Sequence, residues 1–386
     1  KALGLSSSSF KISNKSKLPI QIKKINLNSD TYDFDKIINY NTSLSFILDD
    51  ISTSINKNEI YNESKISIDY SFLGLQKTQN KQISSFNILE DDLVNLDRFI
   101  VPNNLNQFSF IDLDTLSKKA IIRKGSWLIE KSIYLKNGYK LSIKPGAKID
   151  FVNGSFIFVD ESPVDIIGSK VDSIYMFSSD SSGMGLYVRN SLVKSEINYL
   201  SFKNMRGLNY LNGAINFYNS DVYINNSVFT NNYSEDAVNI IESNFTIENS
   251  RFYGIASDAI DIDFGYGEIK NCIFGNIKND AIDVSGSKVL ITHCDVSNSG
   301  DKAISCGEAS TVTISSINLL RCGIGIAAKD NSKVDVSNAS IRHMRLGLAA
   351  YQKKPEFGPA FINCESSFFS HCDQIFDTRN NSVIKM

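Results

Sequence analysis

Acidic side chains recur at fixed spacing in the second half of the sequence, and they are the residues best suited to chemistry. Paired carboxylates can give or take a proton, activate water or ligate a hard cation such as Ca²⁺. Lys302, 22 residues after Asp280, would offset part of the repulsion between such carboxylates. The catalytic candidates in this set are Asp258, Asp261, Asp280, Asp283 and Lys302.

Stacked carboxylates need an explanation, because two of them about 4.8 Å apart repel by roughly 1 kcal/mol in water and about 3.5 kcal/mol at an effective dielectric of 20. A bound Ca²⁺ would offset this, with Asp258 and Asp280 as its candidate ligands. A shared proton with a raised pKa, or the ammonium of Lys302, would do the same. The alternative is structural: the aspartates that begin each segment bond to turn N–H groups, and the others are solvated surface.

Further residues could contact a substrate. A lyase or epimerase acting on a uronate needs a base and a cation that neutralises the carboxylate, and such side chains occur towards the C-terminus. His293 instead occupies an asparagine position of the repeat, which favours a hydrogen bond at a corner. The substrate-binding candidates are Asp263, Glu308, Tyr351, Lys353, His343 and Arg345.

A 22-residue repeat must position these side chains. Alternating segments that start at Asp236, Asp258, Asp280 and Lys302 each precede a second alternating segment by about a dozen residues. Asn, Ser, Gly and Asp separate the short segments, as expected for strands joined by turns. A 22-residue unit of short strands predicts an all-β fold, a right-handed parallel β-helix whose coils stack about 4.8 Å apart.

Stacked coils place like residues in columns, and two columns are visible. One is apolar and predicts an internal stack: Phe202, Phe229, Phe252, Phe274, Val296, Leu319 and Ile341. The other predicts an asparagine ladder at a corner: Asn226, Asn249, Asn271, His293, Ser316 and Asn338. In the next column, Cys272 and Cys294 are expected on adjacent coils as small buried residues.

Residues 1–115 lack the repeat and carry alternating runs such as Phe10-Lys11-Ile12, so we expect a small β-rich domain of the sandwich type. Residues 116–386 are expected to form the β-helix, with a C-terminal cap after Tyr351. The formal charge of −2 argues against a nucleic-acid partner. No apolar stretch reaches the roughly 18 residues needed to span a bilayer.

Two resemblances add to this interpretation. The region from Gly125 to about Pro359 resembles the β-helix domain associated with bacterial CotH-type (spore-coat kinase-like) surface proteins. The stretches that carry it include Gly125-Ser126-Trp127-Leu128-Ile129, Asn279-Asp280-Ala281-Ile282-Asp283 and Tyr351-Gln352-Lys353-Lys354-Pro355. The motifs Ser257-Asp258, Asn279-Asp280 and Gly300-Asp301-Lys302 are more distantly similar to those of polygalacturonase-like glycosidases, with the family's histidine replaced.

The CotH-type resemblance implies an exported protein at the cell surface, in the extracellular space or in the periplasm. Its partners would be a polysaccharide or envelope glycan, and a kinase-like or other envelope protein. Two functions remain open. The first is a protein that binds or helps assemble polysaccharide, with a Ca²⁺-binding acidic face. The alternative is a polysaccharide-active enzyme, a glycoside hydrolase, lyase or epimerase, that uses the aspartates between residues 258 and 308.

Overall fold

The computed structural model describes residues 9–13, 19–27, 30–39, 43–47, 66–73, 78–83, 101–136, 138–207, 213–355 and 357–386. The chain divides into two compact units, Lys1–Leu96 and Asp97–Met386. In the described ranges no helix is long and apolar enough to cross a membrane.

The smaller unit is β-rich, as the sequence predicts. Its described strands are β1 (Ser9–Ser13), β2 (Ile20–Leu27), β3 (Asp30–Ile38), β4 (Ser43–Ile47), β5 (Ile66–Phe72) and β6 (Gln79–Ile83). They form an antiparallel pair, β1 with β4, and a four-stranded antiparallel sheet in the order β3-β2-β5-β6. Ile22, Ile25 and Ile38 supply the buried face of the larger sheet.

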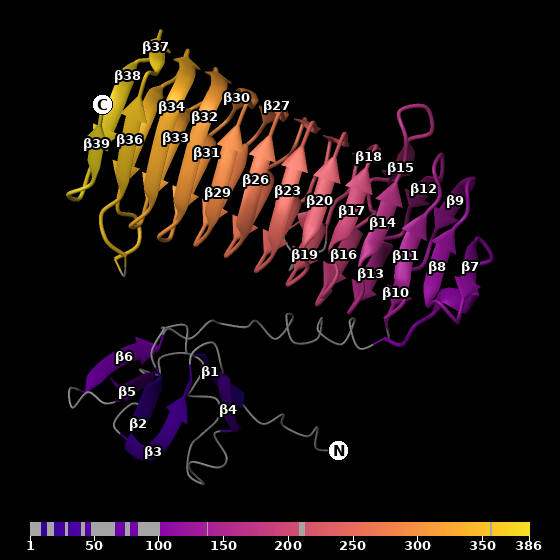
Figure 1. Ribbon diagram of the computed structural model, residues 1–386, viewed down its shortest axis with the longest axis horizontal. Helices are drawn as coiled ribbons and strands as arrows, with labels where there is room; N and C mark the ends of the chain where they lie inside the picture. Colours follow the sequence, from indigo (N-terminus) through magenta and orange to yellow (C-terminus); the bar gives the residue numbers. More distant parts are fainter. Residues whose placement is uncertain are drawn as a thin grey trace. The chain divides into compact units, whose positions relative to one another are not determined.

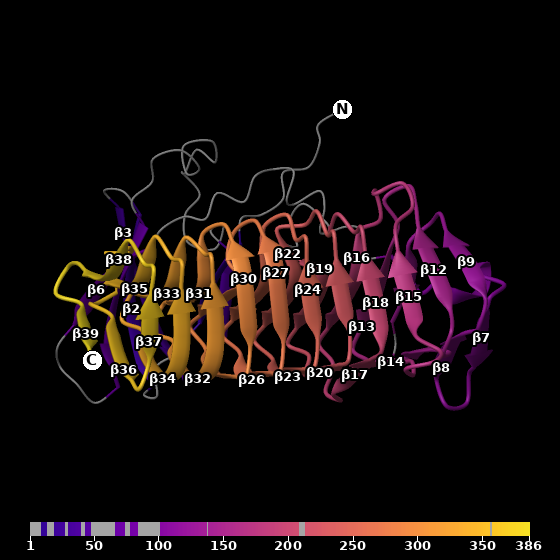
Figure 2. The ribbon, with the colours of Figure 1, turned by 90° about the horizontal axis from the view of Figure 1, so that it is seen from above.

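The larger unit is a stack of coils, each of which gives one strand to each of three parallel sheets (Figures 1 and 2). We call these sheets the first, second and third face, in the order in which the chain visits them within a coil. The first face contains β10 (Ile133–Leu135), β13 (Phe156–Asp160), β16 (Gly185–Arg189), β19 (Gly213–Tyr218), β22 (Asp236–Ile241), β25 (Asp258–Asp263), β28 (Ile282–Ser285), β31 (Lys302–Gly307), β33 (Ile324–Lys329), β35 (Leu346–Tyr351) and β38 (Gln374–Thr378).

The second and third faces are joined through two long strands, β32 (Thr311–Leu320) and β34 (Lys333–Arg342). The second face also contains β8 (Lys119–Ile122), β11 (Lys140–Ile143), β14 (Val164–Ile167), β17 (Ser195–Asn198), β20 (Val222–Asn225), β23 (Asn244–Glu248), β26 (Tyr266–Lys270), β29 (Lys288–Thr292), β36 (Phe361–Glu365) and β39 (Val383–Lys385). The third face also contains β9 (Ser126–Ile129), β12 (Lys148–Phe151), β15 (Ile174–Phe177), β18 (Leu200–Lys203), β21 (Val228–Thr230), β24 (Arg251–Tyr253), β27 (Ile273–Ile277), β30 (Asp295–Ser299) and β37 (Phe368–Ser370).

The predicted apolar column is confirmed and runs through the third face. Phe229, Phe252 and Phe274 pair in register and are fully buried. Their rings stack with centroids 4.7 Å and 5.0 Å apart. Each buried aromatic ring stabilises the fold by roughly 1.5–3 kcal/mol relative to an exposed one. The column thus ties consecutive coils together along the axis of the stack.

The predicted asparagine column lies at the corner between the second and third faces. Asn226, Asn249 and Asn271 all have left-handed backbone angles, with φ of 48°, 51° and 52°. Asparagine tolerates this region better than most residues, and glycine and asparagine accordingly occupy the other two corners at several coils. Each amide also donates to an asparagine oxygen of the preceding coil, at 2.9 to 3.3 Å. The ladder therefore satisfies both the corner geometry and the side chains.

A serine column that the repeat does not reveal lines the corner between the first and second faces. The hydroxyl of Ser243 accepts the N–H of Ser220 at 2.8 Å, and Ser310 accepts the N–H of Ser287 at 3.1 Å. Cys272 and Cys294 occupy the equivalent positions at the next corner, both buried with free thiols, as predicted. Small side chains are needed there because each must reach a backbone group of the adjacent coil.

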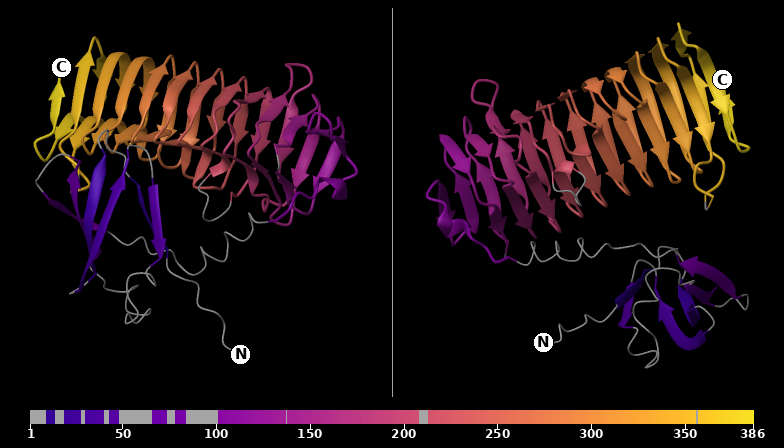
Figure 3. Two further views of the ribbon diagram at one scale, coloured as in Figure 1. Left: turned by 60° about the horizontal axis from the view of Figure 1, so that its bottom comes forward. Right: turned by 180° about the vertical axis from the view of Figure 1, so that it is seen from behind.

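The two ends of the stack differ from what the repeat predicts. β7 (Ile111–Asp114) is antiparallel to β8 and follows the short 3₁₀ helix η3 (Leu105–Gln107). Both were expected in the N-terminal domain of residues 1–115, but they lie in the larger unit, which begins at Asp97. After Tyr351 the chain continues the coils, because β36, β38 and β39 pair in parallel with the strands before them (Figure 3). The described residues after Tyr351 thus form coils of the stack, and their role as a cap stays a prediction.

Candidate active site

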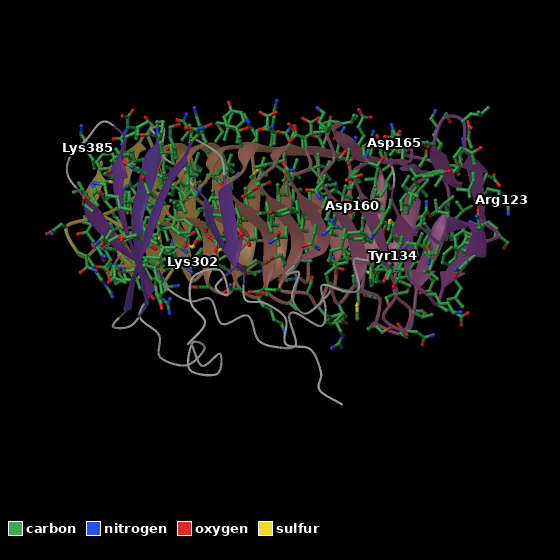
Figure 4. All side chains as sticks on the ribbon, turned by 90° about the horizontal axis from the view of Figure 1, so that it is seen from below. Arg123, Tyr134, Asp160, Asp165, Lys302 and Lys385 are labelled. Carbon is green, nitrogen blue, oxygen red and sulfur yellow. The ribbon has the colours of Figure 1, made fainter. Side chains whose placement is uncertain are left out.

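The aspartates gather on the outer surface of the first face. Asn239, Asp261, Asp283 and Ser305 are aligned in register on β22, β25, β28 and β31. The residues on either side of each, such as Ile260 and Ile262, point into the core and are fully buried. We call these four residues the central column. Lys302, at the start of β31, is labelled in Figure 4 on the same face as Asp160 and Tyr134 of earlier coils.

A second column stands at the start of these strands, where Asp236, Asp258, Asp280 and Lys302 follow one another. Oδ1 of Asp258 accepts the N–H of Asp280 at 2.7 Å and the amide of Asn279 at 2.6 Å. Oδ1 of Asp280 accepts the N–H of Lys302 at 2.9 Å. Asp258 and Asp280 thus cap the backbone of the next coil, as the structural alternative for this column predicts.

Two lysines partly neutralise the aspartates. The ammonium of Lys302 lies 3.3 Å from both oxygens of Asp280 and is hydrogen-bonded to Asp301. Burial lowers the pKa of Lys302, but these carboxylates outweigh it and raise that pKa to about 12. Nζ of Lys329 lies 3.8 Å from Oδ1 of Asp283. Asp283 is therefore the ion-paired carboxylate of the central column.

The remaining aspartates retain protons more readily than usual. Burial, with nearby carboxylates, raises the pKa of Asp258 to about 7 and that of Asp263 to about 6. The pKa values of Asp236 and Asp261 are raised well above their ordinary range, first by burial and then by neighbouring carboxylates. Burial also raises the pKa of Asp280, against the effect of Lys302. The face thus places proton-bearing carboxyls beside an ion-paired one.

Unsatisfied polar atoms flank the two aspartates of the central column. The amide of Asn239 donates to Asp236 at 2.9 Å and to Asp261 at 3.1 Å. Its own oxygen is buried without a hydrogen bond in the described part of the chain, and so is the hydroxyl of Ser305. Buried polar groups are rarely left unpaired in folded proteins. Both atoms lie beneath the surface of the face, so they are unmet polar groups next to Asp261 and Asp283 and not surface contacts.

The predicted substrate-binding residues fall into separate groups. Asp263 ends β25 beside the central column, and Glu308, at the next corner, forms an ion pair with Lys354. Burial raises the pKa of Glu308, but Lys354 outweighs it and leaves that pKa below its ordinary value. Tyr351 is half-buried and pairs in register with Lys329.

The other predicted contacts lie further along the stack. The side chain of Lys353 is exposed, while its N–H donates to Asp330 at 2.6 Å. His343 lies at a corner, where its ring stacks on His371 with centroids 4.6 Å apart. Arg345 directly precedes β35 and is exposed. These residues are on later coils than the aspartates, and no contact joins His343 or Arg345 to them among the described residues.

Two residues of the site are missing from the set named from sequence. Asp236 shares the Asn239 amide with Asp261, and Lys329 pairs with Asp283. Lys329 lies 66 residues after Asp263, which is three repeats of 22, so its position could have been found by extending that column. The column is hard to recognise because its members differ in type at nearly every coil.

A metal site is not apparent in the described ranges, where no three His, Cys, Asp or Glu side chains are arranged to hold an ion. Asp258 and Asp280, the candidate Ca²⁺ ligands, already use one oxygen each for backbone N–H groups. Calcium binding stays a prediction.

The strand pairing makes the larger unit a parallel β-solenoid, and comparison with known sequences agrees. A family model described as a right handed beta helix region matches residues 236–384. No curated protein matches the chain closely enough to count as a relative.

Three solved structures are similar to this chain at low identity. An alginate lyase from Paenibacillus sp. str. FPU-7 is 11% identical, over 63% of this chain and 93% of the lyase, with a TM-score of 0.43. The catalytic domain of a GH87 α-1,3-glucanase in complex with nigerose is 11% identical, over 100% of this chain and 91% of that domain, with a TM-score of 0.45. The A-module of the Azotobacter vinelandii mannuronan C-5 epimerase AlgE4 is 10% identical, over 74% of this chain and 100% of the module, with a TM-score of 0.36.

Proposed function

We propose that the first face hydrolyses a neutral polysaccharide, with Asp261 as the general acid and base and Asp283 as the nucleophile. The observation that carries the proposal is the contrast between these two adjacent carboxyls. Burial and neighbouring carboxylates raise the pKa of Asp261 well above its ordinary range, whereas Asp283 is paired with Lys329. Glycoside hydrolysis needs one carboxyl to donate a proton and a second to act as nucleophile or base.

The chemistry follows from their placement. Asp261 protonates the glycosidic oxygen while the bond from that oxygen to the anomeric carbon breaks. Asp283 forms a bond to the same carbon, and water then displaces it after giving a proton to Asp261. The Cα atoms of residues in register on adjacent coils are roughly 5 Å apart, and side chains that leave the sheet in parallel would keep the two carboxyls near the spacing of about 5–5.5 Å in retaining glycosidases. We therefore expect retention at the anomeric centre.

A neutral substrate is favoured by the charge of the face. Acidic side chains outnumber lysines there, and each one that ionises adds repulsion for a uronate polymer. Exposed aromatic rings beside the face, at Tyr218, Tyr233 and Phe264, offer further apolar contact to a sugar.

The test is turnover of a panel that contains α-1,3-glucan, other neutral glycans, alginate and polygalacturonate. We expect reducing ends from a neutral glycan and no absorbance from unsaturated products. Asp261→Asn and Asp283→Asn should each lower kcat by about 10²–10⁴-fold. Asp335→Asn is the matched control, because Asp335 is an exposed outward aspartate of the second face. Unsaturated products, silence across the panel, or unchanged turnover in Asp283→Asn would each contradict the proposal.

The second candidate is a non-catalytic protein that binds or helps assemble polysaccharide and holds Ca²⁺. It is favoured by the capping bonds of Asp258 and Asp280, which give both side chains a structural role. If it is right, Ca²⁺ binds in a calorimetric titration and Asp258→Asn with Asp280→Asn removes that binding. A flat titration would exclude the calcium site.

The cellular setting is also a proposal. The CotH-type resemblance predicts export to the cell surface or periplasm, and a kinase-like or other envelope protein as partner. A neutral envelope glycan as substrate agrees with that setting.

A further inference from the structure

A hollow of about 400 Å³ lies on the outer surface of the second face, separate from the aspartates of the first. Strands β20, β23, β26 and β29 cross it, and the side chains of Asn244 and Thr246 line its middle. Their side chains are shorter than those at the edges of the hollow. Tyr266, Glu268 and Leu290 border it on the later coils, and Lys194 and Asp221 on the earlier ones.

Tyr266 gives the hollow an aromatic wall. The residue is 60% exposed, and the ammonium of Lys288 lies over its ring, 5.7 Å from the centroid. Because Lys288 occupies one face of the ring, the other face is left for a ligand. Leu290, 38% exposed, adds an apolar edge on the next coil. An exposed tyrosine held by its neighbours is a stacking surface that loses little freedom on binding.

The polar groups of the hollow are held in place and are balanced in charge. Both oxygens of Asp221 accept hydrogen bonds from the Asn244 side chain, at 3.1 Å, and Oδ1 also accepts the Asn244 N–H at 2.8 Å. Glu268 stands on the same strand and face as Tyr266, two residues on. Lys194 and Lys288 offset these two carboxylates. An apolar wall with a few convergent polar groups is typical of a small-ligand site.

We infer that this hollow binds one or more sugar units of a neutral glycan, stacked on Tyr266 and hydrogen-bonded to Glu268 and Asn244. A neutral ligand fits because the two lining carboxylates are offset by Lys194 in the lining and by Lys288 on the other side of the Tyr266 ring. A hydroxyl-rich ligand fits because the polar groups are carboxylates and an amide. The site anchors the polymer without reacting with it. The inference stands on the hollow itself, and it does not depend on hydrolysis at the first face.

The experiment uses the full chain carrying Asp261→Asn, so that turnover cannot consume the probe. Neutral tetra- to hexasaccharides and acidic ones are screened on a glycan array, and hits are titrated by calorimetry. We expect a neutral oligosaccharide to bind, Tyr266→Ala to weaken it at least tenfold, and Tyr266→Phe to keep it. Thr246→Trp fills the middle of the hollow and should also abolish binding.

Tyr175→Ala is the matched control. Tyr175 is 42% exposed on the third face and also has a lysine over its ring, Lys148 at 5.9 Å, but it lies outside this hollow. Its loss should leave binding unchanged. The inference is overturned if no neutral oligosaccharide binds, if only acidic ones do, or if Tyr266→Ala binds as tightly as the parent or no more weakly than Tyr175→Ala. These readouts are independent of whether the first face proves catalytic.

Discussion

The surroundings of Asp261 raise its pKa. Burial is the largest cause of its raised pKa, and Asp236 is the first of the carboxylates that add to it. Asp236 shares the Asn239 amide with Asp261 but belongs to the preceding coil. It therefore acts on the chemistry through Asp261, as a positioning residue.

Asp236→Asn should change the pH profile more than the rate. Asparagine cannot ionise, so the repulsion that an ionised Asp236 exerts on the Asp261 carboxylate is lost and the pKa of Asp261 falls. Because Asp261 must be protonated to act as the acid, the alkaline limb of kcat/KM should move to lower pH. Measuring kcat/KM between pH 4 and pH 9 tests this, with Asp335→Asn as the control. An unshifted limb with a uniformly lower rate would indicate a merely structural role.

The corners are the elements that hold the coils in register. Asn249 combines a left-handed φ of 51° with a 2.9 Å hydrogen bond to Asn225. Two substitutions separate these contributions. Asn249→Gly keeps the backbone angle accessible and removes only the side-chain hydrogen bonds to Asn225 and from Asn271, whereas Asn249→Ala also makes the backbone angle unfavourable.

We expect Asn249→Ala to lower the free energy of unfolding by about 1–2 kcal/mol more than Asn249→Gly does. Urea denaturation followed by circular dichroism measures the difference. Equal losses for the two variants would mean that the ladder bond, and not the backbone angle, requires asparagine there.

Regularity decides which elements could be predicted. The same residue types recur about every 22 residues, so the phenylalanine stack and the asparagine corner could be predicted from the sequence. β7 was not, because an antiparallel strand at the end of the stack has no copy to compare with. Lys329 was missed because its column changes residue type from coil to coil. The hollow beside Tyr266 forms because short side chains lie between longer ones on four neighbouring strands. The repeat pattern does not reveal such differences in side-chain length.

At the scale of the whole molecule, the aspartate face sets how stability depends on pH. A carboxyl whose pKa is raised on folding binds its proton more tightly in the folded state. Stability is then lost as the pH rises, from about 4 through the folded values of about 6 for Asp263 and about 7 for Asp258. Glu308 and Lys302 do not change this window, because their contributions are complete above about pH 4.5 and below about pH 10.5 respectively.

The chain should therefore melt at a higher temperature at pH 5 than at pH 8, by several degrees. Each unit of pKa shift corresponds to about 1.4 kcal/mol. Calorimetry at a series of pH values measures the slope, and Asp258→Asn with Asp261→Asn should flatten it. A melting temperature that rises from pH 5 to pH 8 would contradict the assignment of protonated aspartates.

The near-identity of neighbouring coils says something about how such a face arises. Asp258-Ala259-Ile260-Asp261 and Asp280-Ala281-Ile282-Asp283 differ in no residue type and lie on successive coils. A solenoid that lengthens by tandem duplication copies its charges along with its core, and each copied aspartate lands beside its parent. In such a solenoid the closely stacked carboxyls are present as soon as the coil is duplicated. In the next coil, Lys302 and Ser305 stand in these two columns in place of aspartates. The repulsion between stacked carboxylates therefore ends at that coil, while the aspartates of the two coils before it remain.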